Sequence, residues 1–137
     1  MSTCGIDPNL LPEIEQFRFK YSNKTAALVV KIDIEKLMLE LESVTEYKDF
    51  EELVEELELP FTSPRYVIIS FKWQHKDRVQ FPLCFIYYSP PTKANLNMLY
   101  ASNSVMLSNK AGIPSKVLEL RDSELFNKEW VISQIKK

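Results

Sequence analysis

The feature that most constrains this chain is a pair of long β-rich runs, residues 65–73 and 79–88, separated by a short polar segment. Branched and aromatic residues dominate both runs, which is typical of strands buried in a sheet. The intervening residues 74–78 are polar or charged, as expected of a hairpin loop that faces solvent. We therefore predict that the two runs are central strands of a sheet and that they pair antiparallel.

Three further strands are predicted outside this hairpin. Residues 26–32 are apolar and rich in β-branched side chains, and leucines alternate with Met38 and two glutamates in residues 37–42. Turn-like residues 33–36 join these two segments, so they form a second hairpin. A short strand is expected at residues 116–120.

Helical spacing of apolar residues predicts four helices. The first begins after Asp7 or Asn9, either of which can cap it, and ends near Lys20. The second covers residues 50–57 and has an acidic outer face. The third covers residues 93–109, and the fourth follows Asp122 or Ser123. The predicted order is therefore α-β-β-α-β-β-α-β-α.

This order predicts an α+β fold with one central, five-stranded, mixed sheet. The two hairpins are antiparallel by necessity, while the helices between strands permit parallel crossovers. Helices then cover both faces of the sheet. Because no linker, repeat or low-complexity segment divides the chain, we expect residues 1–137 to form a single domain.

Charge and composition exclude several classes of function. Lys and Arg number 17 against 19 Asp and Glu, so no positive field exists to attract nucleic acid in general. The chain has only two glycines, and they form no spaced cluster that could bind a phosphate. One histidine and two cysteines without a CxxC pair cannot form a structural zinc site. We expect no metal and no cofactor.

Membrane insertion and secretion are also not expected. The longest apolar run, residues 83–88, is far shorter than the roughly eighteen residues of a membrane-spanning helix. Residues 1–9 have neither a basic region nor an apolar stretch, so they do not form a secretory signal. These observations, together with the low cysteine content, predict a cytoplasmic protein.

Cys84 and His75 are the only conceivable pair of nucleophile and base that uses a cysteine. Cys84 lies among apolar residues of a predicted strand, where burial raises the pKa of a thiol and hides it from substrates. His75 lies in the predicted polar loop with no candidate nucleophile near it in sequence. We interpret Cys84 as an inert core residue and His75 as solvent-facing, and an enzyme that uses either remains the alternative.

The third predicted helix has two distinct sides. Leu96, Leu99, Tyr100 and Leu107 fall on one side, which we expect to pack on the sheet. The opposite side then forms an outward ridge of small and apolar residues that would let a partner approach closely. The ridge residues are Met98, Ala101, Ser102 and Val105. Scattered surface hydrophobic residues are the alternative interpretation of this pattern.

Eight short segments of the chain are familiar from one protein family. The segments are FRFK at 17–20, AALVVKID at 26–33, PRY at 64–66, QH at 74–75, RV at 78–79, FPLCFI at 81–86, MLYA at 98–101 and EW at 129–130. With these segments the chain resembles the glia maturation factors, a branch of the actin-depolymerising factor and cofilin homology family. The Met-Leu-Tyr-Ala segment is shared across the wider family, whereas Gln-His and Pro-Leu-Cys-Phe-Ile are more particular to glia maturation factors.

This resemblance implies a function. It implies a mixed sheet between helix layers and no enzyme activity. Members of the branch bind the actin-related protein complex that nucleates branched filaments, inhibit its nucleation and promote dissociation of existing branches. The resemblance therefore implies a monomeric cytoplasmic protein at branched actin networks, such as cortical patches or leading edges, and leaves the nucleus open as a further location.

The resemblance also implies two partner-binding surfaces. The first comprises Ser2, Thr3, Met98, Ala101, Ser102 and Val105, which would enter the cleft of an actin-related subunit. Because Ser2 and Thr3 precede the first helix, we expect them to be accessible to kinases. The second comprises Gln74, Lys76, Asp77, Arg78 and Glu124, which would contact a neighbouring subunit or daughter-filament actin. In its loop, this chain is shorter than the family pattern and has Lys76 where an acidic pair and glycine are usual.

One departure distinguishes the chain from cofilin. Cofilin-type proteins carry lysines just before the Met-Leu-Tyr-Ala segment and in the second half of the helix, where they meet an acidic actin surface. Here Asn97 precedes the segment, and only Lys110 is basic in the second half. A neutral ridge favours an apolar partner surface, so high affinity for ordinary actin should be lost. A cofilin-like severing factor remains the alternative function.

Overall fold

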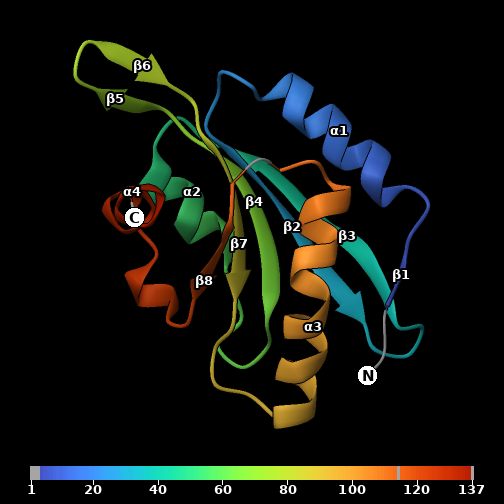
Figure 1. The fold of residues 1–137 in the computed structure, drawn as a ribbon. Helices are drawn as coiled ribbons and strands as arrows, with labels where there is room; N and C mark the ends of the chain where they lie inside the picture. Colours follow the sequence, from blue (N-terminus) through green and yellow to red (C-terminus); the bar gives the residue numbers. More distant parts are fainter. Residues whose placement is uncertain (1–3, 114, 137) are drawn as a thin grey trace.

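The structure, a computed structural model, describes residues 4–113 and 115–136. Its main sheet has six strands in the order β1-β3-β2-β4-β7-β8, and a separate two-stranded arm is formed by β5 and β6 (Figure 1). The strands are β1 Gly5–Ile6, β2 Ala26–Asp33, β3 Met38–Glu46, β4 Arg65–Ser70, β5 Trp73–His75, β6 Arg78–Gln80, β7 Leu83–Tyr88 and β8 Val117–Leu120. The helices are α1 Leu10–Lys20, α2 Phe50–Leu57, α3 Ala94–Lys110, the 3-10 turn η1 Ser123–Leu125 and α4 Lys128–Ile135.

Side-chain alternation along the central strands explains the two helix layers. On β4, Tyr66 and Ile68 join one buried cluster, whereas Val67 and Ile69 join the other. The first cluster contains buried residues of α1 and α3, and the second contains those of α2 and α4. All four of these strand residues are fully buried, so the sheet is covered on both faces. The predicted α+β architecture with helices on both sides is confirmed (Figure 1).

The sheet has six strands rather than the five predicted. The additional strand, β1, pairs parallel with the start of β3. The N–H groups of Gly5 and Asp7 donate to the carbonyl oxygens of Leu37 and Leu39 at 2.9 Å each. A strand of two residues is too short to show an alternation of apolar and polar side chains. It forms through a long-range backbone contact, which the sequence alone does not reveal.

The two central runs do not form one continuous hairpin. The chain leaves the main sheet after Ser70, pairs with itself as β5 and β6, and enters the sheet again at Leu83. His75 pairs with Arg78 around a two-residue turn, in which Lys76 adopts φ 57°. The segment predicted as a loop is therefore largely a projecting β-arm.

The predicted final helix is two elements. The Asp122 side chain accepts a hydrogen bond from the Glu124 N–H and caps η1, and the Asn127 side chain accepts one from the Trp130 N–H and caps α4. The other helices agree with their predicted ranges; α3 is displaced by one residue. Within the residues described, no helix is long and apolar enough to cross a membrane.

Candidate partner-binding surfaces

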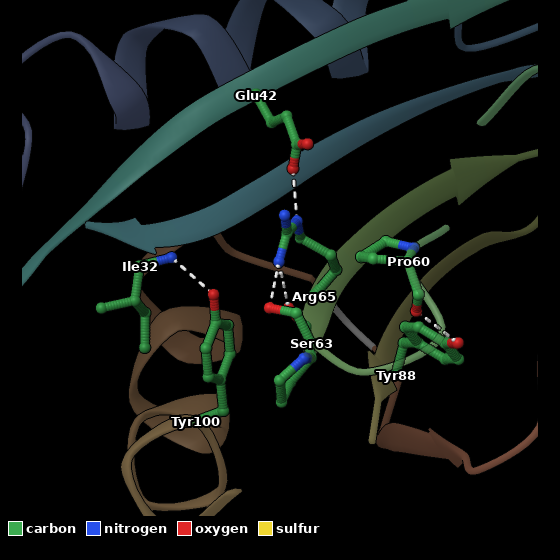
Figure 2. A network of polar contacts seen from close by, with 8 residues as sticks. Ile32, Glu42, Pro60, Ser63, Arg65, Tyr88 and Tyr100 are labelled. Carbon is green, nitrogen blue, oxygen red and sulfur yellow. Dashed lines mark hydrogen bonds and ion pairs between the residues drawn. The ribbon is translucent and has the colours of Figure 1, made fainter. Parts of the chain in front are cut away.

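Buried tyrosine hydroxyls fix the position of α3 on the sheet. The Ile32 N–H of β2 donates to the Tyr100 hydroxyl at 2.9 Å (Figure 2), and the Tyr66 hydroxyl of β4 donates to the Tyr100 carbonyl. The Tyr87 hydroxyl of β7 donates to Oδ1 of Asn97 at 2.6 Å. Bonds from three strands therefore set the rotation of the helix about its axis, which decides the residues that face solvent.

The outward side of α3 consists of the expected residues. Met98 and Val105 are 63% and 60% exposed, and Ala101 and Ser102 are also exposed. Tyr100 and Leu107 are buried on the opposite side. The predicted inward and outward sides are thus confirmed, whereas the binding role of the outward side stays a prediction. The surface is electrically neutral and includes two large apolar side chains.

Three buried polar residues of α3 were not identified from the sequence. Asn103, Ser104 and Ser108 are between 1% and 6% exposed. Ser104 Oγ donates to the Ala101 carbonyl at 3.0 Å, and Asn103 Nδ2 donates to the Leu99 carbonyl at 2.8 Å. Helical spacing places them on the side that faces the sheet. Because they are polar, the pattern of apolar residues did not predict that they are buried.

The N-terminal segment approaches the same helix. Cys4 is buried, and its N–H donates to Oδ1 of Asn103 at 3.1 Å. Ser2 and Thr3, the remaining predicted members of the first surface, lie outside the described residues. The chain that leads to them is nevertheless anchored at α3 through Cys4.

The β5–β6 arm carries four of the five residues of the predicted second surface. Gln74, Lys76, Asp77 and Arg78 are all exposed. Residues 72–80 contain three cations and one anion, although the whole chain carries a charge of −2. At the base of the arm, Nζ of Lys136, the residue that follows α4, lies 5.9 Å from the centre of the Trp73 ring. The arm is therefore a locally basic projection.

Glu124, the fifth residue, lies apart from the arm. β8 is parallel to β7, with Leu120 opposite Tyr88, so η1 follows at the Tyr88 end of β7. The arm joins β7 at its other end, at Leu83. The structure does not bring Glu124 together with Lys76 and Arg78, because a parallel strand directs the chain to the opposite end of the sheet (Figure 1).

Cys84 and His75 are not arranged for chemistry. Cys84 is 1% exposed in β7, and burial raises the pKa of its thiol to about 12. His75 lies in the arm, with its ring centre 4.7 Å from that of Trp73. Among the residues with described positions, no three metal-ligating side chains gather. The interpretation of Cys84 as a core residue is confirmed by its burial.

Comparison with known proteins agrees with these features. Residues 3–136 match the family described as cofilin/tropomyosin-type actin-binding protein. The chain is 34% identical to glia maturation factor of Drosophila melanogaster over 135 residues, which cover 97% of this chain and 96% of that protein. It is 36% identical to human glia maturation factor beta over 130 residues, which cover 93% and 89%.

Solved structures show the same fold. The solution structure of glia maturation factor from Caenorhabditis elegans superposes with a TM-score of 0.81 at 32% identity, covering 98% of this chain and 96% of that one. Plasmodium berghei actin depolymerization factor 2 superposes with a TM-score of 0.83 at 20% identity, covering 100% and 99%. At that lower identity, the second likeness shows the fold alone.

Proposed function

Because the chain belongs to the glia maturation factors, within the cofilin/tropomyosin-type actin-binding family, we propose that it regulates branched actin networks. The family consists of non-enzymatic regulators of the actin machinery. The proposed activity is to bind the actin-related protein complex that nucleates branches, to inhibit that nucleation and to promote debranching. The proposed location is the cytoplasm, where branched networks form, and the proposed active species is a monomer.

The observation that carries this proposal is the neutral, exposed outward side of α3. Met98 and Val105 present apolar atoms, and the small residues Ala101 and Ser102 let a partner approach the helix backbone. Tyrosine hydroxyls hold the helix in one orientation, so little entropy is lost when it docks. Such a surface favours an apolar cleft in an actin-related subunit over a strongly charged surface.

The cofilin-like alternative is disfavoured by Asn97. Its side chain accepts a hydrogen bond from the Tyr87 hydroxyl and so helps to anchor α3. The cofilin pattern would place a lysine at this position. Only Lys110 is basic in the second half of the helix. We expect affinity for the actin-related complex to exceed affinity for actin monomers and filaments by at least roughly tenfold, or about 1.4 kcal/mol.

The β-arm is proposed as a second contact. Its excess of cations suits an acidic neighbouring subunit or a daughter-filament actin, and it projects from the end of the sheet opposite to the start of α3 (Figure 1). Docking through α3 would then leave the arm free to engage a neighbour. In this mechanism, the protein contacts two subunits at the branch junction, and the binding free energy of the two contacts favours their separation.

Phosphorylation at the N-terminus is proposed to weaken docking. A phosphate on Ser2 or Thr3 would add about 1.5 to 2 negative charges close in sequence to the anchored Cys4. Its desolvation in an apolar cleft is unfavourable. Binding of Ser2→Glu and Thr3→Glu variants to the complex should therefore weaken. Unchanged affinity of both variants would remove these residues from the first surface.

The lifetime of individual branches tests the proposed function. Branches should dissociate faster when the protein is added, and the complex should nucleate fewer new ones. Co-sedimentation with actin filaments, at the ionic strength used for the branch measurements, distinguishes this function from the cofilin-like alternative. Strong filament binding with severing of unbranched filaments would favour a cofilin-like factor, and unchanged branch lifetimes and nucleation would contradict the proposal.

A further inference from the structure

Three connections leave the same end of the sheet. Arg65, the first residue of β4, pairs with Tyr88, the last residue of β7, and Tyr88 pairs with Leu120, the last residue of β8. The loop from α2 to β4, the link from β7 to α3, and the link from β8 to η1 are therefore neighbours at this end (Figure 1).

Each of the elements at this end presents a large exposed apolar side chain. Phe61 in the α2–β4 loop is 78% exposed, Met98 in the second turn of α3 is 63% exposed, and Leu125 in η1 is 53% exposed. Isolated apolar residues are common on protein surfaces and require no explanation. Here three such residues lie at one end of the sheet, and one of them, Met98, belongs to the proposed docking side of α3.

The loop that carries Phe61 is held rigidly. The Tyr88 hydroxyl donates to the Pro60 carbonyl at 2.7 Å, and Arg65 Nη1 donates to the Pro64 carbonyl and to Ser63 Oγ, both at 2.7 Å. Arg65 is itself oriented by its ion pair with Glu42 on β3 (Figure 2). Residues on both sides of Phe61 are thus bonded to the sheet, although its own side chain projects into solvent.

This combination distinguishes Phe61 from an ordinary surface residue. A phenyl ring in water gains free energy when a partner covers it, and a clamped backbone reduces the conformational entropy lost on binding. Aromatic anchors of this kind supply a large share of the energy at protein interfaces. Phe19 on α1 is even more exposed, at 85%, but it lies away from this end of the sheet.

We propose that Phe61 is a further anchor of the docking surface, inserted into an apolar pocket of the same actin-family subunit that receives the outward side of α3. The inference rests on the proposed function, because it identifies the partner through the α3 surface. It adds a contact from a different segment of the chain, so the docking surface extends across the end of the sheet from α3 to the α2–β4 loop.

A set of matched variants tests this proposal by equilibrium binding to the purified actin-related complex. Phe61→Ala should weaken binding about tenfold or more. Phe19→Ala removes an equally large exposed ring elsewhere and should leave affinity unchanged. Tyr88→Phe preserves the Phe61 ring but removes the bond to Pro60, so it should produce a smaller loss. Circular dichroism and denaturant unfolding establish that each variant is folded.

The outcomes separate this inference from the proposed function. Failure of the unsubstituted protein to bind the complex overturns both. If Met98→Ala with Val105→Asp loses affinity while Phe61→Ala binds as well as Phe19→Ala, the Phe61 anchor is wrong and the proposed function survives. If Tyr88→Phe binds like the unsubstituted protein, the clamped loop makes no contribution and that part of the inference is overturned.

Discussion

The backbone N–H of Cys4 donates a hydrogen bond of 3.1 Å to Oδ1 of Asn103, a residue 99 positions further along the chain. Asn103 is 1% exposed, and its side-chain amide also donates to the Leu99 carbonyl and, at 3.6 Å, to the Cys4 thiol. A single buried side chain therefore connects the N-terminal segment to the helix that we propose docks on the partner. This contact positions the segment together with the pairing of β1 and β3.

Replacing Asn103 should release the N-terminal segment. Asn103→Leu removes the acceptor of a buried N–H, at a cost of about 1–3 kcal/mol. The N–H groups of Gly5 and Asp7, which bond to the end of the β2–β3 turn and to β3, should then exchange with solvent faster. Hydrogen exchange monitors both amides. Val105→Ala changes an exposed residue of the same helix and should leave their exchange unaltered. Equal rates in all three proteins would contradict the role of Asn103.

Gly112 should be difficult to replace. Its φ of 71° lies in the left-handed region, and an added Cβ would lie 2.8 Å from Arg18 Nη1, which donates to the Ala111 carbonyl at 3.3 Å. Gly112→Ala should therefore lower the free energy of unfolding by about 1–2 kcal/mol or more. In an Arg18→Ala background the loss should be smaller, because the close contact is absent. Equal losses in both backgrounds, measured by denaturant unfolding, would exclude that contact as a cause.

The spacing of apolar residues predicted which side chains of a strand or helix face the core and which face solvent. Alternate burial of Tyr66 and Ile68 against Val67 and Ile69 follows from the strand period of two, and the outward exposure of Met98 follows from the helical period. These periods persist because the apolar residues on one side of each helix or strand pack in a core, which also fixes the side that faces solvent.

Long-range pairing explains what the sequence did not reveal. β1 is defined by two backbone bonds to a strand more than thirty residues away, and β8 directs Glu124 away from the arm by pairing parallel with β7. Asn103 is polar, so periodicity alone gave no reason to expect it in a core. Phe61 was not identified because the clamp on its loop comes from Tyr88 and Arg65, which are bonded to it only in three dimensions.

Stability should fall steeply at alkaline pH. Burial, with a smaller contribution from Glu119, raises the pKa of Tyr87 to about 12, and burial also raises the pKa values of Tyr66 and Tyr100. The ordinary pKa of tyrosine is about 10, so the unfolded chain releases these protons first. The stabilisation is complete below pH of about 10 and is lost as pH rises toward about 12. Denaturant unfolding at a series of pH values should show this fall in the free energy of unfolding, and the fall should be shallower in Tyr87→Phe. A free energy of unfolding that does not change between pH of about 10 and about 12 would contradict the prediction.

The outward side of α3 should supply most of the docking energy. Met98→Ala removes an apolar anchor, and Val105→Asp places a charge where the cleft would desolvate it. Binding to the actin-related complex should weaken by at least about 2 kcal/mol, and both nucleation inhibition and debranching should decline. Val44→Asp makes the same chemical change at an exposed valine of β3 and should retain affinity. A folded double variant that binds normally would exclude the α3 surface.

The arm should separate docking from debranching. Lys76→Ala with Arg78→Ala removes two exposed charges, and contacts at such wet positions contribute little affinity and are screened by salt. Docking to the complex should therefore survive. The debranching rate should fall further than the binding loss explains, because separating a branch requires a second contact on a neighbouring subunit. Lys36→Ala with Lys48→Ala gives the same change in net charge away from the arm and should debranch normally. If the arm variant debranches at the normal rate, or loses docking and debranching in equal proportion, the division of work between the two surfaces is wrong.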